Sequence, residues 1–467
     1  MEHQQARHDP LARSHSPSAP LSLNEDGEVR ASLSTLPLEL KLKVVEEVYR
    51  DVLKVPSLGA WIEQEKINSS TRLTVDEAPT DLAALSVESR EWHALCAPKL
   101  WETIGVYAQS LIALPFLLAE ILPKYGGHVR TLRIDFADEA QLFTRPMDMD
   151  EFDIWHARTG LRDLARELND DARGIDDEED VLDVLAARAV RQCGNIHTLA
   201  LALGDDMVPR PRLFRAIKVQ SRVWKIRSLR LAVGETSQDH VAQVEALFAS
   251  STFLRHLTLV FPDYLTGNVF RVAALISRFS SLRSLTLDNL TAQDLARLHL
   301  SSPLEYLHLR SSKRTIYELT TFQNFLAPFA EALHTLILDE VVAYAEGSLH
   351  SFNLPRLRHL AADFIPGFFP LDLFRDSPIS HLQIETGYSN LPTLLLFLKG
   401  HSSTMRECTY AGNELYVHSS NMREVETQFE TIKQWCTVNK VEYRFPSLQE
   451  MQGDDWSDYC SSSSDSS

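Results

Sequence analysis

The feature that most constrains this chain is a short apolar motif that recurs along most of its length. Each copy has an apolar residue, two other residues, a leucine, any residue and a second apolar residue, as in LRSLTL at 282–287. Nine copies occur in order, beginning at Val129, Ile196, Ile226, Leu254, Leu282, Leu304, Leu333, Leu357 and Ile379. From Leu199 onward the central leucines lie 30, 28, 28, 22, 29, 24 and 22 residues apart. Because chance would give only a few such matches, the series predicts a repeated structural unit.

Within each copy the alternation predicts a strand whose two apolar side chains point inward and whose intervening side chain points outward. Helical patterns lie between copies, for example at 241–253, 269–279 and 322–332, and MRECTY at 405–410 is a weaker last copy. The motif and its spacing resemble leucine-rich repeats, which have roughly 20–29 residues each. That resemblance implies an α/β solenoid, or horseshoe, in which neighbouring units bury one another. The asparagine that usually follows the strand is mostly missing, so we expect irregular turns.

One long gap interrupts the repeats, between Leu132 and Leu199. We interpret residues 137–192 as an insertion with helices at 152–168 and 181–192 around an acidic loop at 170–180. A calcium loop needs oxygen ligands at fixed positions around a glycine turn. Only Gly174 is present and the register of the acids does not fit, so a solvated loop is the better interpretation.

Ahead of the repeats, residues 33–104 carry apolar side chains at helical spacing. Leu40, Val44 and Val48 are followed, after an intervening segment, by Trp92 and Leu100. The pattern predicts three short helices. A bundle of this size cannot cover all of its apolar surface by itself.

This region resembles an F-box, the segment by which substrate receptors dock onto the Skp adaptor of a cullin–RING ubiquitin ligase. The resemblance rests on LPLEL at 36–40 followed by Val44, on DLAALSVESREW at 81–92, and on APKLW at 97–101. The module would span residues 32–105, with an insert at 54–80 of the kind that many fungal-type relatives carry. The resemblance implies a set of adaptor-facing or bundle-core residues: Leu36, Pro37, Leu40, Val44, Leu82, Leu85, Trp92, Leu100 and Trp101.

The bulk composition excludes some partners. A formal charge of −18 and a pI near 5.4 argue against a nucleic acid held by phosphate contacts and against an anionic membrane. The five cysteines are scattered and form no C-x-x-C pair, which favours a reducing compartment. Apolar runs such as 111–119 are too short to span a bilayer, and the first thirty residues lack a signal-type apolar core. We therefore expect a cytoplasmic or nuclear protein.

The two ends of the chain are polar. Residues 1–31 predict a disordered arm, and residues 446–467 predict a disordered, acidic, serine-rich tail. Between them, the repeat region would extend over 106–445. An amphipathic helix at 422–436 and a strand at 441–445 are expected to cap its open end, since repeat arrays require capping units.

The sequence lacks the glycine loops, H-E-x-x-H, G-x-S-x-G and kinase signatures of common enzymes. Neither a metal site nor a cofactor is predicted, since the histidines have no acidic or thiol partners at ligand spacing. We expect an adapter rather than an enzyme, with the Skp adaptor, a cullin scaffold and an unidentified protein substrate as partners. The alternative is a leucine-rich-repeat scaffold without a ligase role, whose helical module serves as an N-terminal cap. Outward strand positions supply the substrate-face candidates: Arg133, Arg230, Thr258, Thr286, His308, Ile337 and Gln383.

Overall fold

The computed structural model describes residues 36–52, 80–107, 116–135, 178–202, 210–232, 244–245, 247–248, 251, 253–260, 276–288, 292–344, 351–364, 371–386, 391–412 and 422–445. The predicted arm and tail, and all of the predicted insert except Thr80, therefore lie outside the described residues. So, wholly or largely, do the acidic loop at 170–180 and the helices expected at 152–168, 241–253 and 269–279.

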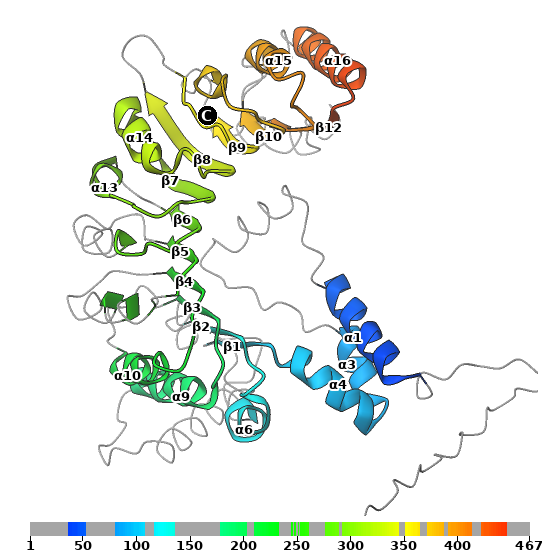
Figure 1. Ribbon diagram of the computed structural model, residues 1–467, viewed down its shortest axis with the longest axis vertical. Helices are drawn as coiled ribbons and strands as arrows, with labels where there is room; N and C mark the ends of the chain where they lie inside the picture. The colour runs from blue at the N-terminus through cyan, green and yellow to red at the C-terminus, as the bar shows by residue number, and fades with distance from the viewer. Residues whose placement is uncertain are drawn as a thin grey trace, which may run out of the picture. The chain divides into compact units, whose positions relative to one another are not determined.

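The chain forms two compact units, which meet in the sequence at residues 100 and 101. The helical unit contains α1 Leu38–Val52, α3 Thr80–Val87 and α4 Arg90–Leu100 (Figure 1). The three predicted helices are thus present. Residues 103–105, which the sequence placed in the helical module, lie instead in the first strand of the second unit.

The second unit is built on one parallel sheet in which every strand pairs with the next strand in the sequence (Figure 1). In the described part of the chain the strands are β1 Thr103–Tyr107, β2 Thr131–Asp135, β3 Thr198–Ala202, β4 Ser228–Ala232, β5 His256–Val260, β6 Ser284–Asp288, β7 Tyr306–Glu318, β8 Thr335–Tyr344, β9 His359–Phe364, β10 His381–Thr386, β11 Glu407–Gly412 and β12 Glu442–Arg444. The prediction of a strand at each repeat copy is confirmed, as is the mixed α/β class.

Parallel strands need crossover connections, and in the described part of the chain many of these contain a helix. These helices are η3 Leu117–Ile121, α6 Leu122–Tyr125, α9 Glu178–Gln192, α10 Pro211–Gln220, α13 Ala292–Arg297, α14 Leu319–Leu326, η4 Ala327–Phe329, η5 Leu371–Phe374, α15 Leu391–Gly400 and α16 Met422–Asn439. The helices predicted at 181–192 and 422–436 are confirmed. The one expected at 322–332 ends earlier, at Leu326, because Pro328 cannot donate the next helical hydrogen bond.

The core of the sheet unit lies on the face that the repeat leucines share. On β6, for example, Leu285 and Leu287 are fully buried among apolar side chains of the connecting helices. Successive strand residues point to opposite faces. Thr286 and Asp288 therefore lie on the other face of the sheet, where the functional positions were expected.

Within the core, Asp183 of α9 caps the neighbouring helix α10. Its carboxylate is 1% exposed and accepts hydrogen bonds from the backbone N–H groups of Arg212 (2.9 Å) and Leu213 (2.8 Å). These are the second and third residues of α10, the positions that a capping side chain satisfies. Burial raises the pKa of the Asp183 carboxyl, although these two hydrogen bonds and the nearby Arg210 and Arg212 act in the opposite direction.

The sequential strand order also bears on function. Open α/β sheets bind small ligands where the strand order reverses and leaves a crevice. The order of the described strands from β1 to β12 contains no reversal. This architecture favours recognition along an extended surface over a single deep ligand site.

Candidate functional site

The helical unit has a small core that leaves much of its apolar surface open. Val45, Trp92 and Cys96 are buried together, and other apolar side chains that are themselves only partly buried pack against them. Trp92 is 1% exposed at the centre of this core. The backbone N–H of Trp92 donates to the Ser89 hydroxyl (3.2 Å) just before α4, which gives that helix an N-terminal cap.

A lysine occupies the most buried described position of α1. The Lys41 ammonium is 2.6 Å from the Glu91 carboxylate and lies 5.7 Å from the centre of the Trp92 ring. Both contacts join α1 to α4, and cation–aromatic contacts of this kind add to an ion pair. They fix the rotation of α1, and with it the set of side chains that α1 presents to solvent.

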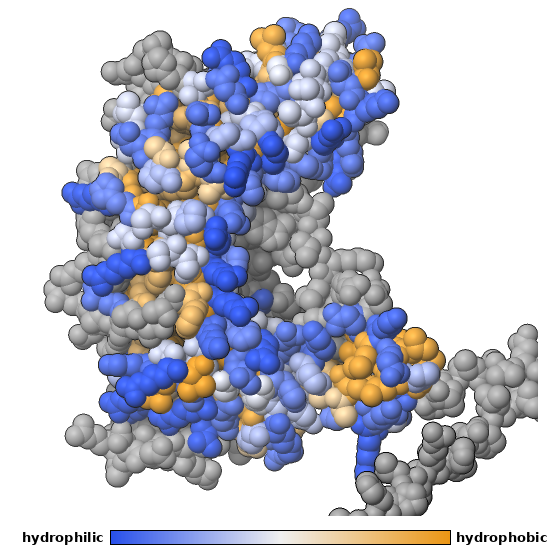
Figure 2. Space-filling view, in the orientation of Figure 1, coloured by the Kyte–Doolittle hydropathy of each residue, from blue (hydrophilic) through white to orange (hydrophobic). Residues whose placement is uncertain are grey.

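The exposed set is apolar. Leu38, Leu40 and Leu42 of α1 are each about half exposed, at 52%, 45% and 48%, and Val87 at the end of α3 is 82% exposed. Figure 2 shows apolar residues gathered on this unit. Leu38 and Leu42 lie one turn apart on the same side of α1, whereas Leu40 lies on the other side. Contiguous exposed apolar surface is typical of protein interaction sites, so these side chains are candidates for one.

The adaptor residues predicted from the sequence divide into several groups. Pro37 and Leu40 are exposed, and Leu36, Val44, Leu85 and Leu100 are half-buried. The side chain of Leu82 lies outside the described residues.

The two tryptophans differ from the rest of that set. Trp92 belongs to the core and is not available for docking. Trp101 lies outside the helical unit. It packs against the core of the sheet unit, and its ring stacks on that of Tyr125 in α6 with centroids 5.4 Å apart. Leu38, Leu42 and Val87 are also exposed, although they do not belong to the docking set predicted from the sequence. They could have been suspected because a bundle of three short helices has more apolar residues than it can bury.

The seven substrate-face candidates share one register row across the sheet. Arg133 of β2 aligns through Ala200 with Arg230 of β4, and the row continues strand by strand to Gln383 of β10. They also lie on the face opposite the leucines, as predicted. Arg133, Arg230, Thr258 and Gln383 are half-buried.

The middle of this row is closed, which corrects the expectation for three residues. Thr286, His308 and Ile337 are 7%, 3% and 0% exposed. Ile337 packs with Ala361 and Tyr306 in a small apolar cluster of its own on this face. These three residues cannot contact a partner without rearrangement.

The next register row on this face holds Asp288 of β6, Arg310 of β7 and Asp339 of β8, and His308 reaches into it from the substrate-face row. His308 Nε2 lies 2.9 Å from the Asp339 carboxylate, and the Arg310 guanidinium lies 3.6 Å from that of Asp288. Burial raises the pKa of the Asp288 carboxyl, although Arg310 and His308 act in the opposite direction. Buried charges persist when they are paired in this way, so this network stabilises the local pairing of the three strands.

Two histidines on the same face also come together. The rings of His359 and His381, on β9 and β10, stack with centroids 4.3 Å apart, and His381 Nδ1 is 2.8 Å from the Ser380 hydroxyl. Burial lowers the pKa of His359, and the neighbouring His381 and His334 lower it further. Among the described residues, no group of three or more His, Cys, Asp or Glu side chains is placed to hold a metal ion.

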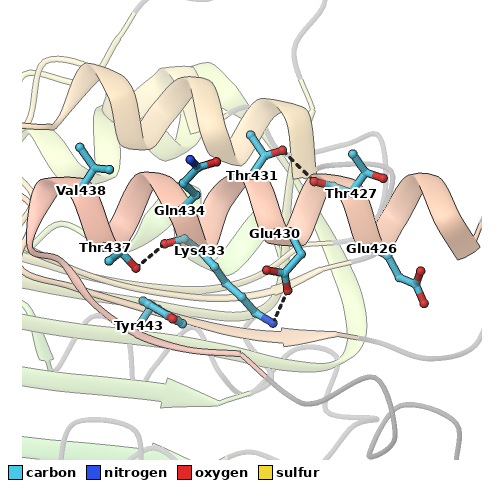
Figure 3. Close-up of a pocket in the computed structure, with 9 residues that line it drawn as sticks. All are labelled: Glu426, Thr427, Glu430, Thr431, Lys433, Gln434, Thr437, Val438 and Tyr443. Carbon is cyan, nitrogen blue, oxygen red and sulfur yellow. Dashed lines mark hydrogen bonds and ion pairs between the residues drawn. The ribbon is translucent and has the colours of Figure 1, made fainter.

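A shallow groove of about 710 Å³ runs along α16 beside Tyr443 of β12 (Figure 3). Its polar groups bond to each other. Thr431 donates to the Thr427 carbonyl (2.7 Å), and Lys433 pairs with Glu430 at 3.0 Å. Ligand pockets instead direct a few polar groups at the bound molecule, so this groove makes a poor ligand site.

The thiols do not supply a nucleophile in the described part of the chain. Cys96, Cys193, Cys408 and Cys436 are all buried and unpaired. Burial raises the pKa of Cys193 to about 12 and of Cys436 to about 11. Because the thiolate is the reactive form, these side chains are inert at neutral pH.

Comparison of the sequence with models of known protein families gave no match, and neither did comparison with curated proteins. In the part of the chain that the structure describes, no helix combines the length and apolar character needed to cross a membrane.

Proposed function

We propose that this chain is the substrate-recognition adapter of an SCF-type cullin–RING ubiquitin ligase. In this proposal the helical unit is an F-box-like module that binds the Skp adaptor, and the sheet unit is an irregular leucine-rich-repeat solenoid that holds a protein substrate for degradation. The chain itself would supply no catalytic group. Its resemblance to fungal-type F-box proteins remains the source of the adaptor assignment.

The observation that carries the proposal is the pairing of an apolar helical surface with an extended sheet. Leu38, Leu40 and Val87 are exposed on a unit whose own core is already closed by Trp92 and Lys41. An obligate partner would remove that apolar surface from water, at about 25 cal/mol per Å². The sequential sheet offers a long row of side chains on one face, which suits recognition of another protein better than turnover of a small molecule.

Co-purification of the full chain with the Skp adaptor tests the proposal. Leu40→Asp places a charge at an exposed position of α1 that the sequence predicts to contact the adaptor. We expect it to weaken adaptor binding at least about tenfold, or about 1.4 kcal/mol. Leu38→Asp, on the other flank, would then identify which side of α1 contacts the adaptor.

Leu396→Asp is the matched control, because Leu396 is also an exposed leucine on a helix but belongs to α15 of the sheet unit. Its adaptor binding should equal that of the wild type. Absence of binding by the wild-type chain would refute the ligase role and leave the scaffold alternative. Binding by the wild type that Leu40→Asp and Leu38→Asp both preserve would instead refute the assigned surface.

A further inference from the structure

A line of basic side chains follows the amino-terminal edge of the sheet. The residues that come just before successive strands lie side by side across the sheet. The carbonyl of each accepts backbone N–H groups from the corresponding residue and from the first residue of the next strand. The Arg227 carbonyl, for example, accepts from Arg255 (2.8 Å) and His256 (2.9 Å). From β2 to β6 this position is held by residues that we call the basic row: Arg130, His197, Arg227, Arg255 and Arg283.

The side chains of the basic row are accessible. Arg227, Arg255 and Arg283 are exposed, and Arg130 and His197 are half-buried. Within the described part of the chain, the guanidinium groups of Arg227 and Arg255 have no ion-pair partner, and Arg130 donates weakly to the Asn195 carbonyl (3.4 Å). Arg283 pairs with Glu305 at 2.8 Å, but both side chains are about half exposed, and such pairs contribute little.

The electrostatic field of the row acts on its own histidine. Burial lowers the pKa of His197, and the positive charges of Arg130, Arg227 and Lys225 lower it further, whereas Glu102 opposes them. Lys225 thus adds a cation to this edge. Among the described residues, Glu102 and Glu305 hold the same register position just before β1 and β7, at the two ends of the row. A cluster of this sign stands out on a chain whose formal charge is −18.

We propose that the basic row binds an extended acidic segment of a partner protein. Neighbouring strands lie about 4.8 Å apart, so five positions span about 19 Å. An extended peptide covers that length with about six residues. This proposal rests on the proposed function in one respect: it takes the partner to be a substrate of the ligase.

The charge density of the row favours a peptide over a duplex nucleic acid. A DNA duplex carries one phosphate per about 1.7 Å of its axis and would bring about eleven phosphates into the same 19 Å. The row offers far fewer cations, and the negative charge of the whole chain would repel the rest of the duplex. A short acidic peptide carries only as many charges as the row can pair.

The chain's own tail at 446–467 is acidic and is the main competing occupant. It follows β12, six strands from β6 in the sheet order. That separation is about 29 Å, and it increases to about 48 Å at β2. The 22 residues of the tail could span up to about 73 Å if extended, so the whole row is within its reach. The experiment must therefore separate the two occupants.

Fluorescence anisotropy with a labelled polyglutamate peptide of about eight residues tests the proposal on the full chain. We expect saturable binding that weakens as NaCl increases, because exposed charges are screened. The double variant Arg227→Glu, Arg255→Glu should weaken binding at least about tenfold. A matched double variant, Lys218→Glu with Arg423→Glu, makes the same change in charge on helices α10 and α16 and should stay within about twofold of the wild type.

Other outcomes would overturn the proposal. Equal loss of binding in the two double variants would show that only net charge matters. A thymidine oligonucleotide that binds as tightly as the peptide would reassign the row to nucleic acid. A chain ending at residue 445 that binds the peptide about tenfold more tightly would show that the tail already occupies the row. The variant Leu40→Asp should bind the peptide normally, so failure here and failure of adaptor docking are distinguishable.

Discussion

The carboxylate of Asp183 offers a quantitative test of how the sheet unit is held together. Replacement by alanine removes the side-chain cap of α10. It leaves the buried N–H of Leu213 and the partly buried N–H of Arg212 without this acceptor. Each buried unsatisfied donor costs about 1–3 kcal/mol. Loss of the desolvated carboxylate offsets part of that cost. We therefore expect Asp183→Ala to lower the free energy of unfolding by about 2–4 kcal/mol.

Urea unfolding followed by circular dichroism measures this loss, and amide hydrogen exchange at Arg212 and Leu213 locates it. Asp183→Asn keeps one acceptor oxygen and should lose about half as much. Glu430→Ala is the control: it removes an ion-paired carboxylate on α16 that is 71% exposed and should cost less than about 0.5 kcal/mol. If Asp183→Ala proves as mild as Glu430→Ala, with unchanged exchange at α10, the capping argument is wrong.

Three further predictions concern titration, reactivity and packing. Because burial raises the folded-state pKa of Asp183, the folded chain holds this proton more tightly than the unfolded chain. The stability of the wild type relative to Asp183→Asn should therefore decrease as the pH rises above the ordinary carboxyl range. Urea unfolding between about pH 4 and 7 measures this difference, and a difference that does not change with pH would contradict the raised pKa. The described thiols, including Cys193 with a pKa of about 12, should resist a disulfide-exchange reagent at pH 8 in a Cys460→Ser background and react only after denaturation; rapid reaction of the native chain would contradict their burial. Leu336→Ala removes a fully buried side chain of β8 and should lower the free energy of unfolding in urea by about 2–5 kcal/mol. Leu396→Ala, at a position that is 70% exposed, should change it very little. Similar losses in the two variants would refute the assignment of the core face.

The sequence predicted the repeating elements because their signal is local. In copies such as 282–287 the alternation of apolar and polar residues requires a strand with one buried face, whatever the rest of the chain does. The same reasoning located α9 and α16 and the three helices of the helical unit. It failed at 322–332, where a proline ended the helix early.

The candidate surfaces were predicted less completely. Around α1 the sequence placed Pro37, Leu40 and Val44 in one set of adaptor-facing or bundle-core residues. It could not separate the exposed Pro37 and Leu40 from the half-buried Val44, because burial depends on how α4 packs. Trp92 and Trp101 have the same residue type and similar surroundings in sequence. One lies in the core of the helical unit, and the other packs against the sheet.

The sequence by itself thus determined that each repeat copy forms a strand and which side chain of each Leu-x-Leu points away from the core. Only the tertiary structure decided which of those outward positions stay open. His308 is closed through a contact with Asp339, 31 residues away, and Ile337 by packing against the next strand. Likewise, arginines that are 28 residues apart in the sequence, such as Arg227 and Arg255, form a row only because strand register brings them side by side. Burial and charge density are properties of neighbours in space, and in a parallel sheet those neighbours come from distant parts of the chain.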